Sequence, residues 1–275
     1  MGKSFLYLDT FALVRVASDA ALASSARNYF ATNDFFLTIS AMNLMELVSW
    51  PKRWSEVVSF VSSVPFCVAQ NVDEIAAAEV ACYPNELASL PLGFCSLDHS
   101  FSADALSNAL ALHLQGKVSE FARVYRAGYR EVLEVILEKR KSFPPDSPAR
   151  YSRVEREMFM QSSVLSVLFP VHGDFLARAL AEARAAGGNE GINIARFKSV
   201  YIQALAIFVE YYVQKKAGKP SDLGDILQLG LLPYVDIAVL DNERCNLIHR
   251  FNREKLFPGF LRACNLSEFK ATIGA

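Results

Sequence analysis

Residues 221–242 of the chain read SDLGDILQLGLLPYVDIAVLDN. The pattern predicts a short helix that begins at Ser221 and is broken by Pro233, followed by a strand over residues 237–240. The strand is apolar at every position, which is typical of a strand buried on both faces of a parallel sheet. Four aspartates stand around these two elements: Asp222, Asp225, Asp236 and Asp241. The stretch therefore predicts a buried strand accompanied by an unusual number of carboxylates.

The order of strand and acid recurs near the start of the chain. Residues 5–8, FLYL, are apolar throughout and precede Asp9. Residues 35–39, FFLTI, precede Ser40, which is a good N-cap for a helix that carries Glu46. Strands that alternate with helices predict a parallel sheet covered by helices on both faces. We therefore expect an α/β fold with a parallel sheet between two layers of helices.

A helical block interrupts this alternation. A third strand is expected at residues 66–68, but residues 92–216 contain no predicted strand. Apolar residues recur there at helical spacing. Helices are predicted over residues 103–115, 118–141, 154–169, 174–186 and 193–215. We therefore expect an all-helical insertion at residues 92–216 between two parts of one α/β domain, residues 1–91 and 217–275. Beyond Phe257 no element is predicted.

Composition limits the functional classes. The chain has 275 residues, 52% of them hydrophobic, and a formal charge of −1, so no overall basic field attracts nucleic acid. Its five cysteines include no CxxC pair, which favours a reducing compartment over a disulfide framework or a structural zinc site. Nucleotide-binding glycine loops are absent. No apolar run is long enough to span a membrane. We expect a soluble, cytoplasmic protein without a membrane partner.

Six acids are expected at one edge of the predicted sheet. They are Asp9, Glu46, Asp222, Asp225, Asp236 and Asp241. Two of them follow strands directly, and functional sites in parallel sheets form beyond the carboxyl ends of the strands. Several carboxylates in one place repel one another unless cations balance them. Because hard divalent cations prefer carboxylate oxygen, the pattern predicts a site for Mg²⁺ or Mn²⁺.

Three pieces of the chain together resemble the PIN-domain nucleases. They are FLYLDT at residues 5–10, TISAMNLMEL at residues 38–47, and the quoted stretch at residues 221–242. The resemblance covers roughly residues 1–90 and 216–252. It implies a Rossmann-like, three-layer PIN fold and a Mg²⁺- or Mn²⁺-dependent endonuclease that usually cleaves RNA. It also implies a hydrolytic, toxin-like chemistry at a two-metal acidic site.

The resemblance also assigns roles to particular residues. Asp9, Glu46 and Asp241 take the positions of metal-binding acids, and the third acid is either Asp222 or Asp225. Asp236 matches a supporting acid of some larger relatives. Thr10 and Ser40 match hydroxyl positions that often help to hold a water molecule at the metal. Two features depart from the family: the helical insertion, and Leu240 where Thr or Ser usually precedes the last acid.

Other interpretations of the same residues stay open. Asp9 and Asp241 could each be a helix cap, and Asp222 and Asp225 could answer the positive end of a helix dipole. The chain could then be a binding or scaffold protein with a degenerate PIN site. A structure-specific DNA nuclease is a further alternative, because an acidic sheet edge does not distinguish DNA from RNA.

The helical insertion offers a surface for partners. Arg123, Arg126 and Arg130 form a stripe on the helix predicted at residues 118–141, and such a stripe could bind the phosphates of RNA. The alternative is a solvated helix face in which these arginines pair with glutamates of the same helix. The insertion could also carry a homodimer contact or a contact to another protein.

Overall fold

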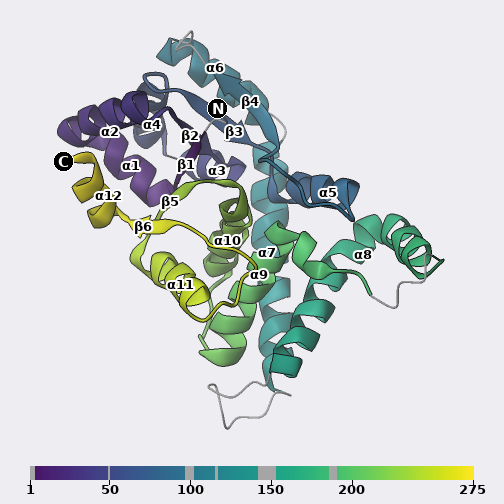
Figure 1. The fold of residues 1–275 in the computed structure, drawn as a ribbon. Coiled ribbons are helices and arrows are strands. Elements are labelled where there is room, and N and C mark those ends of the chain that lie inside the picture. The colour runs from purple at the N-terminus through teal and green to yellow at the C-terminus, as the bar shows by residue number, and fades with distance from the viewer. Residues whose placement is uncertain (1–3, 49, 97–101, 115–116, 142–152, 186–190) are drawn as a thin grey trace. The chain divides into compact units, whose positions relative to one another are not determined.

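The computed structural model describes residues 4–48, 50–96, 102–114, 117–141, 153–185 and 191–275. Its described residues form an α/β fold built on a six-stranded mixed sheet (Figure 1). The strands are β1 (Ser4–Leu8), β2 (Phe35–Ile39), β3 (Phe66–Ala69), β4 (Leu92–Ser96), β5 (Ile237–Leu240) and β6 (Ala263–Asn265). They lie in the order β4-β3-β2-β1-β5-β6, and only β4 is antiparallel to its neighbour.

The chain divides into two compact units, which we describe separately. The first unit comprises residues 1–71, 90–123 and 234–275 and contains the whole sheet. Its helices are α1 (Thr10–Ser18), α2 (Ala20–Asn33), α3 (Ala41–Val48), α4 (Pro51–Val61), α6 (Ala103–Leu114), α11 (Asn242–Arg253) and α12 (Leu266–Ile273). The second unit comprises residues 72–89 and 124–233.

One face of the sheet packs on the main core of the first unit. Alternate strand residues such as Leu6, Leu37 and Val239 are buried there against helices α1, α2, α4, α6 and α12. Residues between them point to the opposite face, where the buried side of α11 contacts β5 and β6. From β1 the chain adds β2 and β3 on one side of the sheet, and later adds β5 and β6 on the other side. Because parallel crossovers are right-handed, the crossover helices of the two halves cover opposite faces.

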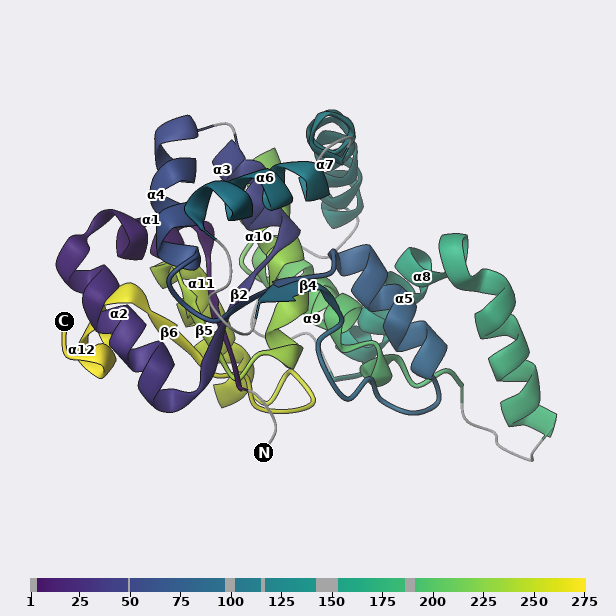
Figure 2. The same ribbon diagram turned by 90° about the horizontal axis from the view of Figure 1, so that it is seen from above.

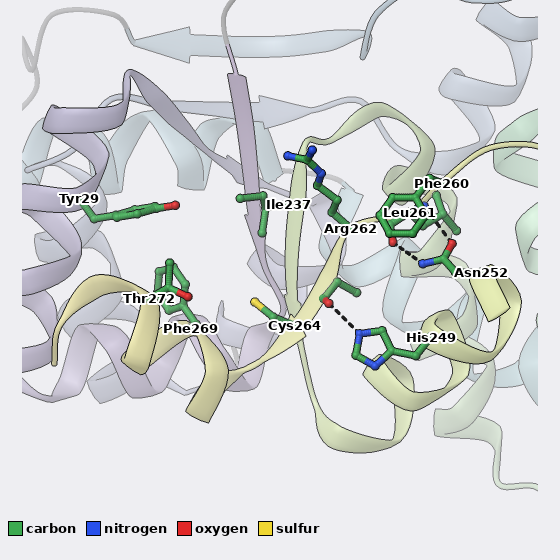
Figure 3. A pocket seen from close by; sticks show the side chains of 11 residues that line it. Tyr29, Ile237, His249, Asn252, Phe260, Leu261, Arg262, Cys264, Phe269 and Thr272 are labelled. Atoms are coloured by element: carbon green, nitrogen blue, oxygen red, sulfur yellow. Dashed lines mark hydrogen bonds between the residues drawn. The ribbon is translucent and has the colours of Figure 1, made fainter.

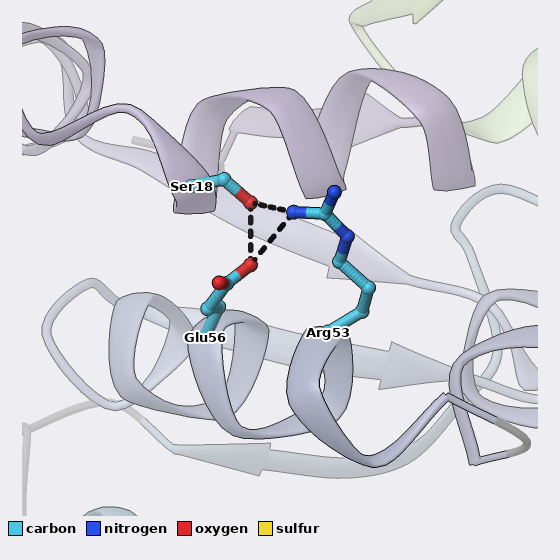
Figure 4. A network of polar contacts seen from close by, with 3 residues as sticks. All are labelled: Ser18, Arg53 and Glu56. Carbon is cyan, nitrogen blue, oxygen red and sulfur yellow. Dashed lines mark hydrogen bonds and ion pairs between the residues drawn. The ribbon is translucent and has the colours of Figure 1, made fainter.

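A small polar network joins two helices of this layer. Arg53 of α4 donates to the hydroxyl of Ser18 at 2.9 Å and to the carboxylate of Glu56 at 3.0 Å, and Ser18 donates to Glu56 at 2.6 Å (Figure 4). The hydrogen bond from Ser18, and then the one from Arg53, lower the pKa of Glu56. The three groups therefore fix the end of α1 beside the start of α4.

The second unit is helical in its described part. Its helices are α5 (Val72–Cys82), α8 (Arg153–Ala185), α9 (Lys198–Ile207) and α10 (Pro220–Gln228), and α7 (Lys117–Lys141) runs from the first unit into it. A 3-10 turn, η1 (Ile194–Arg196), precedes α9, a π-helical segment, η2 (Phe208–Val213), continues it, and a second 3-10 turn, η3 (Leu229–Tyr234), follows α10. Figure 2 gives a second view of these helices.

One helix contact in the second unit is unusually well defined. The Glu79 side chain of α5, only 1% exposed, accepts hydrogen bonds from the backbone N–H and the hydroxyl of Ser199 at 2.7 and 2.6 Å. The N-cap residue of α9, Phe197, provides no side-chain cap. Glu79 therefore caps α9 from a neighbouring helix and places a negative charge at its positive end.

All four predicted strands are present, and two strands that were not predicted, β4 and β6, join them. The prediction that residues 92–216 hold no strand is wrong, because β4 pairs antiparallel with β3. The unassigned tail beyond Phe257 forms β6 and α12. The compact units also divide the chain elsewhere than residues 91/92 and 216/217, since α5 and α10 belong to the second unit while β4 and α6 belong to the first.

Candidate functional site at the carboxyl ends of β1 and β5

Asp9 and Asp241 meet where two adjacent parallel strands end. β1 pairs with β5 through Tyr7 and Leu8, so the residues that follow the two strands lie side by side. One carboxylate oxygen of Asp9 accepts the backbone N–H of Asp241 at 2.7 Å. The other accepts the N–H of Ala12 at 2.6 Å and caps α1. Asp9 therefore ties both strand ends and the first helix together.

Asp241 caps a second helix at the same edge. Its Oδ1 accepts the N–H of Arg244 at 2.9 Å in the first turn of α11. The capping alternative for Asp9 and Asp241 is thus correct as far as it goes. Capping leaves carboxylate lone pairs available, because each oxygen can accept more than one bond.

The neighbouring strand β2 ends in a buried capping box. Ser40 accepts the N–H of Asn43 at 3.0 Å, and Asn43 accepts the N–H of Ser40 at 2.8 Å. The Asn43 amide also donates to the hydroxyl of Thr10 at 3.0 Å. The two hydroxyls are therefore held by Asn43, which locks the start of α3 to the start of α1. They are positioned at this edge as part of its frame.

Glu46 belongs to the same edge through its effect on Tyr7. Tyr7 is fully buried, and its pKa is raised by burial first, then by the charge of Asp9, and further by Glu46. Both carboxylates thus act on one phenol, Asp9 from the N-cap of α1 and Glu46 from α3. The pKa shift favours the neutral form, so this hydroxyl stays protonated and cannot be a base at neutral pH.

The positive ends of three helices moderate this negative charge. α1, α3 and α11 each begin directly after a strand, at the edge that holds Asp9, Glu46 and Asp241. A helix N-terminus carries roughly half a positive charge and exposes N–H groups that bind anions, including phosphate. The edge therefore combines carboxylates that suit a cation with backbone donors that suit a phosphate group.

Asp236 does not join these acids. Its carboxylate accepts the N–H of Phe5 at 2.7 Å, beside the start of β1. It precedes β5 whereas Asp241 follows it, so the two acids are separated by roughly 16 Å of extended chain. The expectation that Asp236 shares one sheet edge with the other acids is wrong. Its role is to close the amino end of the β1–β5 pair.

Asp222 and Asp225 belong to the second unit and are described there. The Asp222 carboxylate accepts the N–H of Lys219 at 2.9 Å and lies 3.7 Å from the ammonium of Lys216. This is the first-turn capping role expected for an acid at the start of α10. Both aspartates are half-buried. The choice of either as a third metal-binding acid stays a prediction.

The arginine stripe is only partly visible. Arg130 is exposed on α7. The side chains of Arg123 and Arg126 lie outside the described residues, although the helix that carries them is described. Binding of RNA phosphates by this stripe stays a prediction.

Three residues near the edge escaped the sequence analysis. Asn43 could have been found, because Ser at an N-cap followed three residues later by a side chain that reaches back is a capping box. Arg244 is only 4% exposed. A cation in the first turn of a helix is unfavourable because it opposes the helix dipole, so its position in the sequence indicates a special role. Phe11 is 51% exposed two residues after Asp9, with the guanidinium of Arg15 lying 5.4 Å from its ring centre.

The donor set at this edge is compatible with a hard divalent cation. Within the described residues, no three Asp, Glu, His or Cys side chains are grouped closely enough to hold a metal ion alone. Mg²⁺ needs less than that, since one or two carboxylates usually hold it together with water and substrate phosphate. Asp9 and Asp241 supply such a pair, and the atoms they would offer to a cation are carboxylate oxygens.

Comparisons with protein-family models, curated proteins and solved structures found no match for this chain. Among the described residues, no helix combines the length and apolar character that crossing a membrane requires.

Proposed function

We propose that the first unit is a PIN-like nuclease domain that hydrolyses phosphodiester bonds of RNA with the help of Mg²⁺ or Mn²⁺. The observation that supports this most is the contact between Asp9 and the residue Asp241 at the carboxyl ends of β1 and β5. The carboxylate of Asp9 thus reaches the backbone of Asp241, a residue from a distant part of the chain, at the end of the sheet where parallel sheets bind ligands. The charge of Glu46 also acts on Tyr7, and this supports its candidacy as a further acid of the site.

The chain's own groups have distinct parts in this reaction. Asp9 and Asp241 would hold the cation, with Glu46 as the third acid. The N–H groups at the starts of α1, α3 and α11 would orient the scissile phosphate. Thr10 and Ser40, fixed by Asn43, position the surrounding frame. A bound divalent cation supplies activation of water and neutralises charge that develops on the phosphate.

RNA cleavage in Mn²⁺ tests the proposal. Asp241→Asn is the informative variant, because Asn caps a helix as well as Asp does and the fold should be retained. We expect cleavage to fall at least about a hundredfold, as it does when a group that stabilises transition-state charge is removed. The matched control is Asp236→Asn, at the opposite end of the same strand, which should cleave like the wild type. Equal rates for wild type and Asp241→Asn would refute the site.

A binding or scaffold protein is the second candidate, and one observation favours it. Both carboxylate oxygens of Asp9 already hold backbone N–H groups, at 2.6 and 2.7 Å, so Asp9 has a complete structural role without a metal. Mn²⁺ separates the two candidates. A nuclease site should raise the melting temperature in proportion to the logarithm of Mn²⁺ concentration, whereas a degenerate site should not respond. Parallel RNA and DNA substrates distinguish the DNA nuclease alternative.

A further inference from the structure

A cavity of about 300 Å³ opens in the first unit beside the edge strand β6, away from the acids discussed above (Figure 3). α2, α11, α12, β5 and the segment leading into β6 contribute to its walls. The apolar part of the lining is Tyr29, Ile237, Phe260, Leu261, Cys264 and Phe269. Phe260 is 76% exposed, a large apolar surface left in water at the cavity wall. The cavity is thus a preformed apolar site of the size that takes a small molecule.

Most polar groups of the lining are already engaged. The Asn252 amide donates to the carbonyl of Leu261 at 2.7 Å and accepts its N–H at 3.1 Å. Thr272 donates to the carbonyl of Glu268 at 2.9 Å, and a ring nitrogen of His249 lies 3.0 Å from the carbonyl of Ala263. These groups shape the wall and leave little hydrogen-bonding capacity for a ligand.

Two polar groups differ from the rest. Within the described residues, neither the Tyr29 hydroxyl nor the Arg262 guanidinium makes a side-chain hydrogen bond or an ion pair. In Figure 3 the Tyr29 hydroxyl points toward Ile237, and the Arg262 side chain rises on the other side of Ile237 and ends above it in the view. Burial, and then the neighbouring Cys264, raise the pKa of Tyr29, so its hydroxyl remains a hydrogen-bond donor at neutral pH.

The charge of the lining is one-sided. None of the described residues that line the cavity is acidic, while Arg262 is permanently cationic and exposed at its margin. The nearest acid that acts on a lining residue is Glu268, whose charge reaches Cys264 from outside the lining. An anionic group beside Arg262 gains an ion pair without displacing an existing one.

We propose that this cavity binds a small aromatic molecule with one negative charge, its ring against the apolar lining and its anionic group at Arg262. A strand from a partner protein is a poorer occupant, because β6 has only three residues and His249 already occupies the carbonyl of Ala263. The proposal is independent of nuclease activity, since none of the acids at the ends of β1 and β5 lines the cavity.

Three naphthalene probes test it on the full chain: 2-naphthoate, the neutral 2-naphthylmethanol and the cationic 2-naphthylmethylamine. Titration calorimetry should give saturable binding of one molecule. We expect 2-naphthoate to bind roughly two- to fivefold more tightly than the alcohol, the range for an exposed ion pair, and the amine to bind most weakly. In Arg262→Gln the affinity for 2-naphthoate should fall to that for the alcohol, whose own affinity stays constant.

Matched variants separate the cavity from the general surface. Arg253→Gln removes an exposed arginine of α11 that does not line the cavity, and it should change nothing. Thr272→Trp fills the cavity from an exposed position of α12 and should abolish binding of all three probes, while Ala271→Trp, one residue away, should not. Equal binding of acid and alcohol to the wild type, an Arg262→Gln variant that behaves like Arg253→Gln, or binding that survives Thr272→Trp would each overturn the proposal.

Discussion

At the scale of single residues, the acids of the chain show how one carboxylate serves two purposes. Asp9 holds backbone N–H groups from two elements that are far apart in sequence, α1 and the start of α11. Asp241 holds only the first turn of its own helix. The two residues look equivalent in sequence, since each follows a buried strand and precedes a helix. They differ in the number of structural elements that each carboxylate holds together.

This difference predicts unequal stability effects. In Asp9→Asn one carboxylate oxygen becomes an NH₂ group, which cannot accept a hydrogen bond. The half-buried backbone N–H of Ala12 or of Asp241 then loses its partner. We expect a loss of about 1–3 kcal/mol in the free energy of unfolding. Asp241→Asn should cost no more than a few tenths of a kcal/mol, because Asn and Asp are comparable N-caps. Urea unfolding of the two variants, compared with wild type, measures both values; equal losses would contradict the distinct roles.

The sequence could predict the pairing of Asp9 with Asp241 but not the position of Asp236. Both members of the pair follow apolar strands, and parallel topology alone brings such residues together. The match to a supporting acid of larger PIN relatives assigns Asp236 to the same site, but it lies five positions before Asp241, directly before the start of β5. A strand rises about 3.3 Å per residue, so these five positions run the full length of β5, from its amino end to its carboxyl end.

At the scale of elements, prediction succeeded where burial leaves a strong pattern. β1, β2, β3 and β5 occupy the interior of the sheet order and are apolar at nearly every position. The two missed strands, β4 and β6, are the edge strands. β4 contains a glycine and a serine, and β6 is the three residues Ala-Cys-Asn. Edge strands need less apolar sequence because one side lacks a neighbour, so their periodicity is weak.

The contact between α5 and α9 yields a prediction of its own. Replacing Glu79 by Ala removes two hydrogen bonds and leaves the buried start of α9 without a cap. The free energy of unfolding should fall by about 2–3 kcal/mol. Ser199→Ala removes only the hydroxyl and should cost less. Because both changes act on one interaction, the double variant should be less destabilised than the sum, with a coupling of about 1 kcal/mol or more.

Chemical denaturation of the four proteins measures this cycle. Glu74→Ala, an exposed acid on the first turn of the same helix, is the control and should change stability by no more than about 0.5 kcal/mol. Additive effects of Glu79→Ala and Ser199→Ala would show that the cap contributes nothing specific.

At the scale of the whole molecule, two buried groups, Tyr7 and Cys245, and the half-buried Cys264 predict a loss of stability in alkali. Burial is the main cause that raises the pKa of Cys245 and of Cys264 to about 11, with Glu268 contributing to both, and burial also raises the pKa of Tyr7. The folded state therefore keeps these protons where the unfolded chain releases them. The contribution of these three groups should be constant from neutral pH to about pH 8.5, the ordinary thiol pKa, and stability should fall as pH rises toward 11.

Denaturant unfolding at a series of pH values checks this sign. Cys264→Ala should flatten the decline between pH 9 and pH 11, because one of the retained protons is gone. Cys82→Ala, at a half-buried cysteine of the second unit, should leave the slope unchanged. Stability that rises over this interval in the wild type would show that the thiols are not held neutral by the fold.

The pairing of β1 with β5 has a consequence for how the protein is made. The hydrogen bond from Phe5 to Asp236 joins residues 231 positions apart. β1 therefore cannot pair with β5, its second neighbour in the sheet, until β5 has left the ribosome. Until then the β1–β2–β3 segment presents the bare side of an apolar strand, the kind of edge that pairs with other chains. Synthesis thus passes through an interval in which the nascent chain depends on dilution or on chaperones to stay out of aggregates.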